Sequence, residues 1–407
     1  MALIGRNLFI GSDEKIFIGT DVIGTDGYDK TTEPTFVGFI TASDAASGDD
    51  FGFSVAVGSG RIVVGAHGND DNGVASGSAY IFDLDGNEVG IITASDGAAN
   101  DNFGRSVSVG SGRIVVGAEG RDYGSNNMQG AAYIFDLNGN QLGIITASDG
   151  ADSDRFGYTV AVGSGRIVVG ANWDDDNGSI SGSAYIYDLS GNQLAKITPS
   201  DGALGDEFGS VAVGSGRIVV GAPRKNIGSN SDQGAAYIFD LDGNEVGIIT
   251  ASDGADSDRF GYSVAVGSGR IVVGANWDDS YQGSAYIFDL DGNEVGIITA
   301  SDAASGDEFG FSVAVGSGRI VVGAWRNDIN SNADQGAAYI FDLDGNEVGI
   351  ITASDGADSD YFGYSVAVGN GRIVAGAHNN HINGVDFGSA YIYNTPEADY
   401  ILDVLDK

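Results

Sequence analysis

The chain has 407 residues, including 67 Gly, 4 Pro and no Cys, and its 19 basic and 57 acidic side chains give a net charge of −38. The absence of Cys excludes disulfides, thiolate metal sites and Cys nucleophiles. The negative charge disfavours nucleic acid as a partner, and no run of about 18 apolar residues predicts membrane insertion. The hydrophobic content of 42% predicts a folded chain with a sizeable core.

Residues 1–35 contain two similar strand-like pieces, LFIGSDEK and IFIGTDV. They predict a β-hairpin with its turn near Ser12 to Glu14. Such an arm could dock on a partner or on a second copy of the chain, which would make a homo-oligomer. The alternative is a leader without fixed structure. No recognisable signal peptide is visible in this segment.

A repeat of about 52 residues begins after this arm and runs to about residue 394. The dipeptide FG recurs seven times at this spacing, and each of these copies is followed after 13 or 14 residues by GA. The FG copies begin at Phe51, Phe103, Phe156, Phe208, Phe260, Phe309 and Phe362. Internal periods of this length are typical of repeat architectures, including propellers.

Each repeat unit predicts four short strands and no helix of any length. In the first unit they are 51–58, 61–66, 77–84 and 88–96, separated by a GSG turn, a variable loop and an Asp-Gly turn. Small residues fill the first two strands and bulky ones the third, as wedge-shaped blades around an axis require. We therefore predict an all-β fold, a seven-bladed β-propeller of four-stranded blades, over an open stack of β units.

The two ends of the repeat region predict how the ring closes. The last unit stops after its third strand, FGSAYIYN at 387–394, whereas FVGFITASD at 36–44 matches the fourth strand EVGIITASD. The N-terminal strand should therefore complete the last blade and remove two exposed edges. This gives an arm at 1–35, a propeller at 36–394 and a tail at 395–407.

With FG, GA and the string ASDGADSDRFGYSVAVGSGRIVVGA in register, the chain resembles the FG-GAP repeat family, in its bacterial subtype. The resemblance covers all seven units and implies a seven-bladed propeller with an interaction role. Integrin-like members carry a DxDxDG calcium loop between FG and GA. Here that loop is GSG or GNG, so those calcium sites are not expected.

Acidic clusters precede each FG and are candidates for a different calcium site, because calcium binds carboxylate oxygens. The alternative is that the first Asp of each cluster forms a local Asx-turn and the others solvate a face. No cofactor is required by either reading. The clearest candidate ligands are Asp149, Asp152, Asp154, Asp253, Asp256, Asp258, Asp355, Asp358 and Asp360.

An Arg begins the second strand of every unit. A ring of guanidinium groups could hold an anion, but a recurring Asp at the end of the third strand favours structural ion pairs within each blade. The expected pairs are Arg61 with Asp83, Arg113 with Asp136, Arg166 with Asp188, Arg217 with Asp240, Arg270 with Asp289, and Arg319 with Asp342.

The variable loop between the second and third strands contains every Trp and every His of the chain. Trp, Tyr and Arg are enriched at binding hot spots, so these loops predict a ligand-binding face. The alternative is that the Trp side chains pack over the blade edge. The candidate residues are His67, Arg121, Tyr123, Trp173, Arg224, Lys225, Trp277, Tyr281, Trp325, Arg326, His378 and His381.

These patterns favour a non-catalytic display or adhesion module that contacts a glycan or protein receptor. No G-x-S-x-G elbow or convincing metal-binding His set supports an enzyme. The acidic, Cys-free composition with only five Lys favours a virion component (phage neck, tail or fibre) or a microbial, extracellular surface protein. The alternatives are a structural virion building block assembled through residues 1–35 with other virion proteins, and a polysaccharide-active enzyme.

Overall fold

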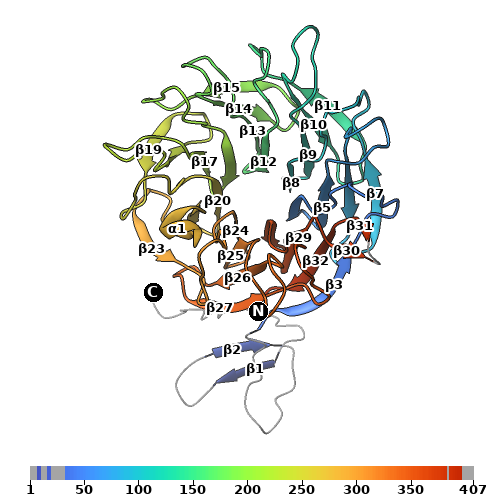
Figure 1. Cartoon of the computed structure of the whole chain (residues 1–407), viewed down its shortest axis with the longest axis vertical. Helices are drawn as coiled ribbons and strands as arrows, with labels where there is room; N and C mark the ends of the chain where they lie inside the picture. The colour runs from blue at the N-terminus through green and yellow to red at the C-terminus, as the bar shows by residue number, and fades with distance from the viewer. Residues whose placement is uncertain (1–6, 11–15, 20–32, 383–384, 397–407) are drawn as a thin grey trace.

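The computed structural model describes residues 7–10, 16–19, 33–382 and 385–396 of the chain. Seven four-stranded antiparallel sheets stand around a common axis like the blades of a propeller (Figure 1). The predicted all-β, seven-bladed fold is confirmed. In the described part of the chain, no helix has the length and apolar character needed to cross a membrane.

Each blade uses its strands in the same radial order. The innermost strands are β4 (Ser54–Gly58), β8 (Val107–Gly110), β12 (Thr159–Gly163), β16 (Ser210–Gly214), β20 (Ser263–Gly267), β24 (Ser312–Gly316) and β28 (Ser365–Gly369). The second strands are β5 (Arg61–Ala66), β9 (Arg113–Ala118), β13 (Arg166–Ala171), β17 (Arg217–Ala222), β21 (Arg270–Ala275), β25 (Arg319–Ala324) and β29 (Arg372–Ala377).

The two outer positions follow the same rule. The third strands are β6 (Ser78–Phe82), β10 (Ala131–Phe135), β14 (Ser183–Asp188), β18 (Ala235–Phe239), β22 (Ser284–Phe288), β26 (Ala337–Phe341) and β32 (Ser389–Asn394). The outermost strands are β7 (Glu88–Ile92), β11 (Gln141–Ile145), β15 (Gln193–Ile197), β19 (Glu245–Ile249), β23 (Glu294–Ile298), β27 (Glu347–Ile351) and β3 (Thr35–Ile40). We number the blades 1 to 7 in this order.

Five short elements lie outside the blades. The strands β1 (Asn7–Ile10) and β2 (Ile16–Gly19) pair antiparallel with each other, and the turn expected near Ser12 to Glu14 lies outside the described residues. In blade 7 the two-residue strands β30 (His381–Ile382) and β31 (Val385–Asp386) form a small hairpin. The four-residue α1 (Asp278–Tyr281) lies in the variable loop of blade 5.

The FG dipeptide is explained by packing within its own blade and against the preceding blade, where Phe51 shares a buried cluster with Ile40 and Ile392. Phe51 is fully buried, and its ring meets those of Tyr80 and Phe82 edge-on at centroid distances of 5.2 and 6.1 Å. The Gly of the GA dipeptide allows the next blade to approach: a Cβ on Gly117 would lie 2.0 Å from the carbonyl oxygen of Gly157. Close packing of identical wedges therefore fixes both dipeptides.

The ring closes through its first propeller strand, as predicted. Strand β3 pairs antiparallel with β32, with Thr35 opposite Asn394 and Ile40 opposite Ala390. The rings of Phe36 and Tyr393 add a contact at 5.4 Å. Blade 7 is thus built from both ends of the propeller region, and β32 is covered by β3 in place of being left as an exposed edge.

Six of the second-strand arginines connect neighbouring blades, which corrects the predicted pairing within one blade for Arg61, Arg113, Arg166, Arg217 and Arg270. The pairing of Arg319 with Asp342 stays a prediction. The Nε of Arg61 donates to the carbonyl oxygen of Leu137 in the next blade at 3.0 Å, and Arg113, Arg166, Arg217, Arg270 and Arg372 make the equivalent bond. Four of these side chains also form ion pairs with an Asp in the turn of that next blade: Arg166 with Asp242, Arg217 with Asp291, Arg270 with Asp344 and Arg372 with Asp85.

The third-strand aspartates have a different role. Asp83 accepts hydrogen bonds from the backbone N–H groups of Asp85 and Asn87 and from the side chain of Asn87. Asp136, Asp188, Asp240, Asp289 and Asp342 repeat this arrangement. For Asp83 these bonds to Asn87 are the main cause of a lowered pKa, with Arg61 a lesser one. Because the Asp83 carboxylate already accepts hydrogen bonds from its own turn, Arg61 bonds to the next blade.

Candidate binding site at the loop end of the propeller

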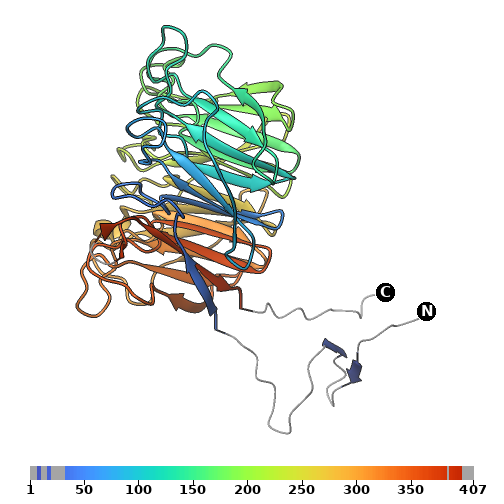
Figure 2. The same cartoon turned by 90° about the vertical axis from the view of Figure 1, so that its right-hand side faces the viewer.

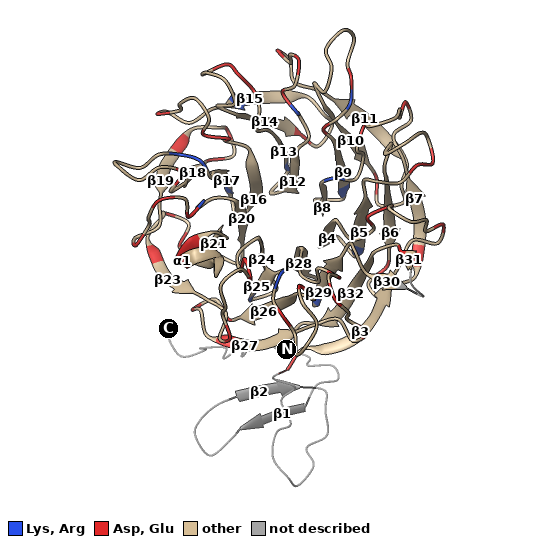
Figure 3. Cartoon of the chain, viewed as in Figure 1, with Lys and Arg blue, Asp and Glu red and all other residues tan. Residues whose placement is uncertain are grey.

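The two ends of the propeller differ in their connections. The long loops that follow the second strands and the acidic loops that precede each FG gather at one end, which lies on the left in Figure 2, and the tight turns lie at the other. We call these the loop end and the turn end. Figure 3 shows Asp and Glu concentrated in the connections, with few on the strands.

Partly exposed aromatic side chains surround the axis at the loop end. They come from the position directly after each FG, and their contacts run from blade to blade: Tyr262 to Phe311 at 5.1 Å, Phe311 to Tyr364 at 4.7 Å, and Tyr364 to Phe53 at 5.0 Å between ring centroids. Arg105 continues the series, with its guanidinium 5.3 Å from Phe53 and 5.0 Å from the ring of Tyr158.

We call this set the aromatic collar: Phe53, Arg105, Tyr158, Tyr262, Phe311 and Tyr364, together with His67, Trp325 and His378 from the position directly after each GA. The collar is incomplete only at blade 4, where the repeat lacks one residue and Ser210 follows FG directly. Trp325 packs against Phe311 and Tyr364, and both histidines pack against Phe53. Six blades therefore contribute to one continuous aromatic surface.

The collar holds a single buried ion pair. Arg105 Nε lies 2.7 Å from an Oε of Glu119, a side chain that is only 6% exposed. Burial acts to lower the pKa of Arg105, but Glu119 and the surrounding tyrosines raise it overall. Burial raises the pKa of Glu119, and Arg105 and Arg155 oppose that rise. The pair thus keeps one fixed cation among the aromatic rings.

The two collar histidines are neutral at neutral pH. Burial lowers the pKa of His67 to about 4, with Arg105 adding to the effect, and burial likewise lowers the pKa of His378 to about 4. The Nδ1 atoms of both rings are buried without a hydrogen-bond partner among the described residues. Both imidazoles therefore act here as aromatic rings. His381, the third histidine, lies apart from the collar, 3.8 Å from Asp360.

Every carboxylate that was proposed as a calcium ligand accepts a hydrogen bond from another group of the protein. The first Asp of each loop accepts a hydrogen bond from a third-strand tyrosine, as in Tyr185 to Asp149 at 2.8 Å. The last Asp accepts a hydrogen bond from the backbone N–H group three residues before it, as in Ala151 to Asp154 at 2.5 Å. The middle Asp accepts a backbone N–H of the variable loop, as in Asn127 to Asp152. The same bonds recur for Asp253, Asp256, Asp258, Asp355, Asp358 and Asp360.

These contacts correct one part of the sequence interpretation. The local turn is closed by the last Asp of each cluster, and the first Asp instead binds the tyrosine hydroxyl of the following blade. All seven such tyrosines make this bond: Tyr80, Tyr133, Tyr185, Tyr237, Tyr286, Tyr339 and Tyr391. Across the described ranges, no three His, Asp or Glu side chains converge as metal ligands would.

Nine of the twelve residues predicted for the binding face fall into three groups. His67, Trp325 and His378 belong to the collar. Trp173 and Trp277 lie under the guanidinium groups of Arg155 and Arg259, at 3.4 and 3.2 Å, and Arg224 and Arg326 pair with Glu207 and Glu308. Tyr123 and Tyr281 are about half exposed, at 51% and 48%.

Two of the predicted face residues are supporting residues instead. Arg121 pairs with Asp96 at 2.6 Å and Asp101 at 3.6 Å, and its side chain is only 14% exposed. Lys225 is 6% exposed, and its Nζ lies 3.1 Å from Asp206 and 3.3 Å from Asp201. Their charges neutralise the acidic loops, so neither side chain is displayed.

Sequence reasoning missed the collar position that directly follows FG. Phe53, Tyr158, Tyr262, Phe311 and Tyr364 look like ordinary residues of a hydrophobic strand. The available signal was variation: this position changes among Phe, Arg and Tyr, and is absent once, while the residues around it repeat almost unchanged.

A closed ring of seven similar blades with a varied loop end defines a β-propeller scaffold of the binding or structural kind. The chain belongs to the FG-GAP repeat family, whose model matches residues 35–82, 87–135, 140–187, 192–239, 244–288, 293–341 and 346–393. Each match begins at an outermost strand and ends at the third strand of the next blade. A comparison with curated proteins finds no match.

Proposed function

We propose that the chain is a non-catalytic binding module that contacts a glycan or protein ligand at its loop end. The observation that carries the proposal is the aromatic collar, a partly exposed surface of aromatic side chains that includes the guanidinium group of Arg105. Aromatic and Arg side chains of this kind supply most of the binding energy in protein interfaces. Rigid strands position each ring, so little conformational entropy is lost on binding.

Glycan-array and protein-binding assays on the full chain test this role. Tyr364→Ala should abolish or strongly weaken binding, because Tyr364 contacts the rings of Phe53, Phe311 and His378. The matched control is Leu142→Ala, which removes a 53% exposed side chain from outermost strand β11. Equal binding by both variants and the unchanged chain would place the ligand elsewhere.

We further propose that the module works on a virion or microbial surface. The net charge of −38 supports solubility outside the cell, and residues 1–35 offer a separate segment for assembly with other virion proteins. Deleting residues 1–32 should abolish incorporation into particles or oligomers while the propeller melts unchanged. Normal incorporation after this deletion would contradict the assembly role.

A further inference from the structure

One polar position at the loop end supplies a hydrogen-bond donor or a cation to the acidic loop in most blades. It lies three residues after the Ala of each GA and faces the last Asp of the acidic loop. In five blades it is Asn, Arg or Lys, and each donates to or pairs with that Asp: Asn69, Arg121, Lys225, Asn327 and Asn380. A donor is needed here because this Asp is almost fully buried in every blade.

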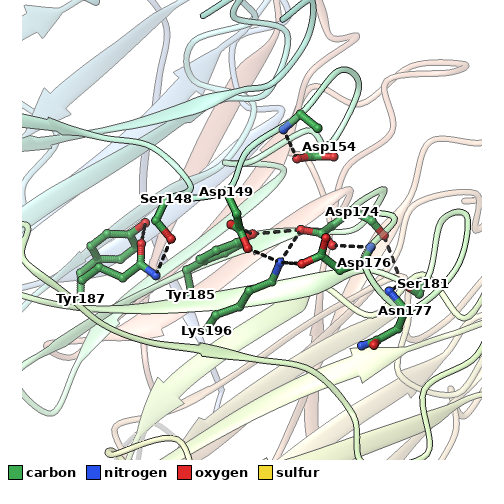
Figure 4. A network of polar contacts seen from close by, with 12 residues as sticks. Ser148, Asp149, Asp154, Asp174, Asp176, Asn177, Ser181, Tyr185, Tyr187 and Lys196 are labelled. Carbon is green, nitrogen blue, oxygen red and sulfur yellow. Dashed lines mark hydrogen bonds and ion pairs between the residues drawn. The ribbon is translucent and has the colours of Figure 1, made fainter.

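Blade 3 has a carboxylate at this position, and a lysine from another strand pairs with it. Asp174 takes the place of the donor, and Lys196 reaches in from outermost strand β15 (Figure 4). Its Nζ lies 2.9 Å from Asp149 and 3.0 Å from Asp174, and it also contacts Asp176. These carboxylates outweigh the effect of burial and raise the pKa of Lys196. The chain itself thus places an ammonium group among the three carboxylates.

Blade 5 repeats two of these three carboxylates without the lysine, and Ser280 takes the place of Asp176. Asp253 corresponds to Asp149 and Asp278 to Asp174, and the hydroxyl of Tyr286 lies between them, 2.9 and 3.3 Å from their carboxylates. The residue that corresponds to Lys196 is Ile297, which is 40% exposed. Burial raises the pKa of Asp258, and Asp278 and Asp253 add to the rise.

A cavity of about 600 Å³ opens where the ammonium would lie. Its lining includes Asp253, Asp258, Asp278 and Ile297, and the residues that line it include five Asp and no Lys, Arg or His. The nearby guanidinium group of Arg259 lies over the ring of Trp277. Tyr281 and Trp277 form a wall, with ring centroids 5.1 Å apart. Among the described residues, blade 5 is therefore the one blade that has a carboxylate at this position and no lysine beside it.

We propose that this blade 5 cavity binds the primary ammonium group of a ligand, in the position that Lys196 occupies in blade 3. The carboxylates of Asp253 and Asp278 accept its N–H donors, and the exposed ring of Tyr281 packs on its alkyl stem. The ligand chemistry is that of a lysine side chain or a free alkylamine. The site is separate from the collar and does not depend on its function.

Calorimetric titration of the full chain with pentylamine and with doubly capped lysine tests the proposal. Saturable binding of either probe is expected, and doubly capped norleucine should not bind. Ile297→Lys supplies the ammonium within the chain, so it should weaken binding at least about tenfold and raise the melting temperature. Ile297→Met has similar length without the charge and should still bind.

The reverse variant creates the same site in blade 3. Lys196→Ile should raise the stoichiometry of amine binding from one to two. Tyr364→Ala in the collar should leave amine binding unchanged, so failure of the collar proposal remains distinguishable. Capped lysine binding better than pentylamine would indicate a peptide ligand, and the opposite order a free amine.

Three results would overturn the assignment. They are no saturable amine binding by the unchanged chain, equal binding by Ile297→Lys and Ile297→Met, or saturation by calcium chloride in place of the amine.

Discussion

The turn end and the loop end of the propeller are built from the same repeats but differ in how far those repeats have diverged. At the turn end, nearly every blade uses the same short turns, the same aspartate and the same arginine bond to the next blade. At the loop end, the tyrosine–aspartate bond is equally regular, but the residues around it change from blade to blade. The contacts that repeat in every blade hold the propeller together. The residues that vary at the loop end can therefore change without opening the ring.

Loss of the closing strand should have the largest effect on this architecture. Deleting residues 1–40 removes β3, exposes the edge of β32 and opens the ring at blade 7. We expect loss of the single cooperative unfolding transition, together with aggregation, measured by calorimetry and light scattering. Deletion of residues 1–32 is the control and should leave both unchanged.

Loss of a tyrosine–aspartate hydrogen bond at the loop end should have the next largest effect. Tyr237→Phe removes the hydroxyl that donates to Asp201 at 2.6 Å. A hydrogen bond to a charged acceptor contributes about 2 kcal/mol, so the free energy of unfolding should fall by that amount in denaturant titration. A change below about 0.5 kcal/mol would mean that the tyrosine–aspartate hydrogen bonds do not hold the blades together.

The collar histidines should make the loop end sensitive to acid. The folded-state pKa of His378 is about 4 and its ordinary value is 6.5, so between these values the unfolded chain binds a proton that the folded chain does not. The stability from neutral His378 is complete above pH 6.5 and is lost as the pH falls toward 4. The free energy of unfolding of His378→Phe should therefore fall by about 2 kcal/mol less between pH 7 and 5 than that of the unchanged chain, measured by urea unfolding. If the free energies of unfolding of His378→Phe and of the unchanged chain changed in parallel with pH, His378 would not be held neutral by burial.

The arginine bonds at the turn end should each contribute less, because these side chains are partly exposed. Arg217→Met loses the bond to Leu290 at 3.1 Å and the ion pair with Asp291, and we expect a cost of about 1 kcal/mol. Combined with Tyr237→Phe at the opposite end, the two costs should add. Strong non-additivity would show that the two ends are energetically coupled.

Chelation should have the smallest effect. Because the proposed calcium ligands already accept hydrogen bonds from Tyr and backbone donors, adding a chelator should not shift the melting temperature measurably. A shift of several degrees would identify bound calcium in the acidic loops.

The strands and their closure could be predicted because each depends on a pattern that repeats along the chain. The match between 36–44 and 88–96 was enough to place β3 beside β32. The partners of Arg61 and Asp83 could not be predicted, because both the same blade and the next one offer an acceptor, and only the geometry between blades selects Leu137. The collar and the blade 5 cavity also required the structure, since each joins residues from several loops whose approach the sequence does not encode locally.

The pairing of β3 with β32 also determines how the molecule would respond to mechanical load. Thr35 lies opposite Asn394, so the arm and the tail leave the propeller at the same end of the same strand pair. A force that pulls these two ends apart would peel the pair open one hydrogen bond at a time. A force applied between the arm and a ligand on the loop end would instead act across the whole ring, whose blades share the strain.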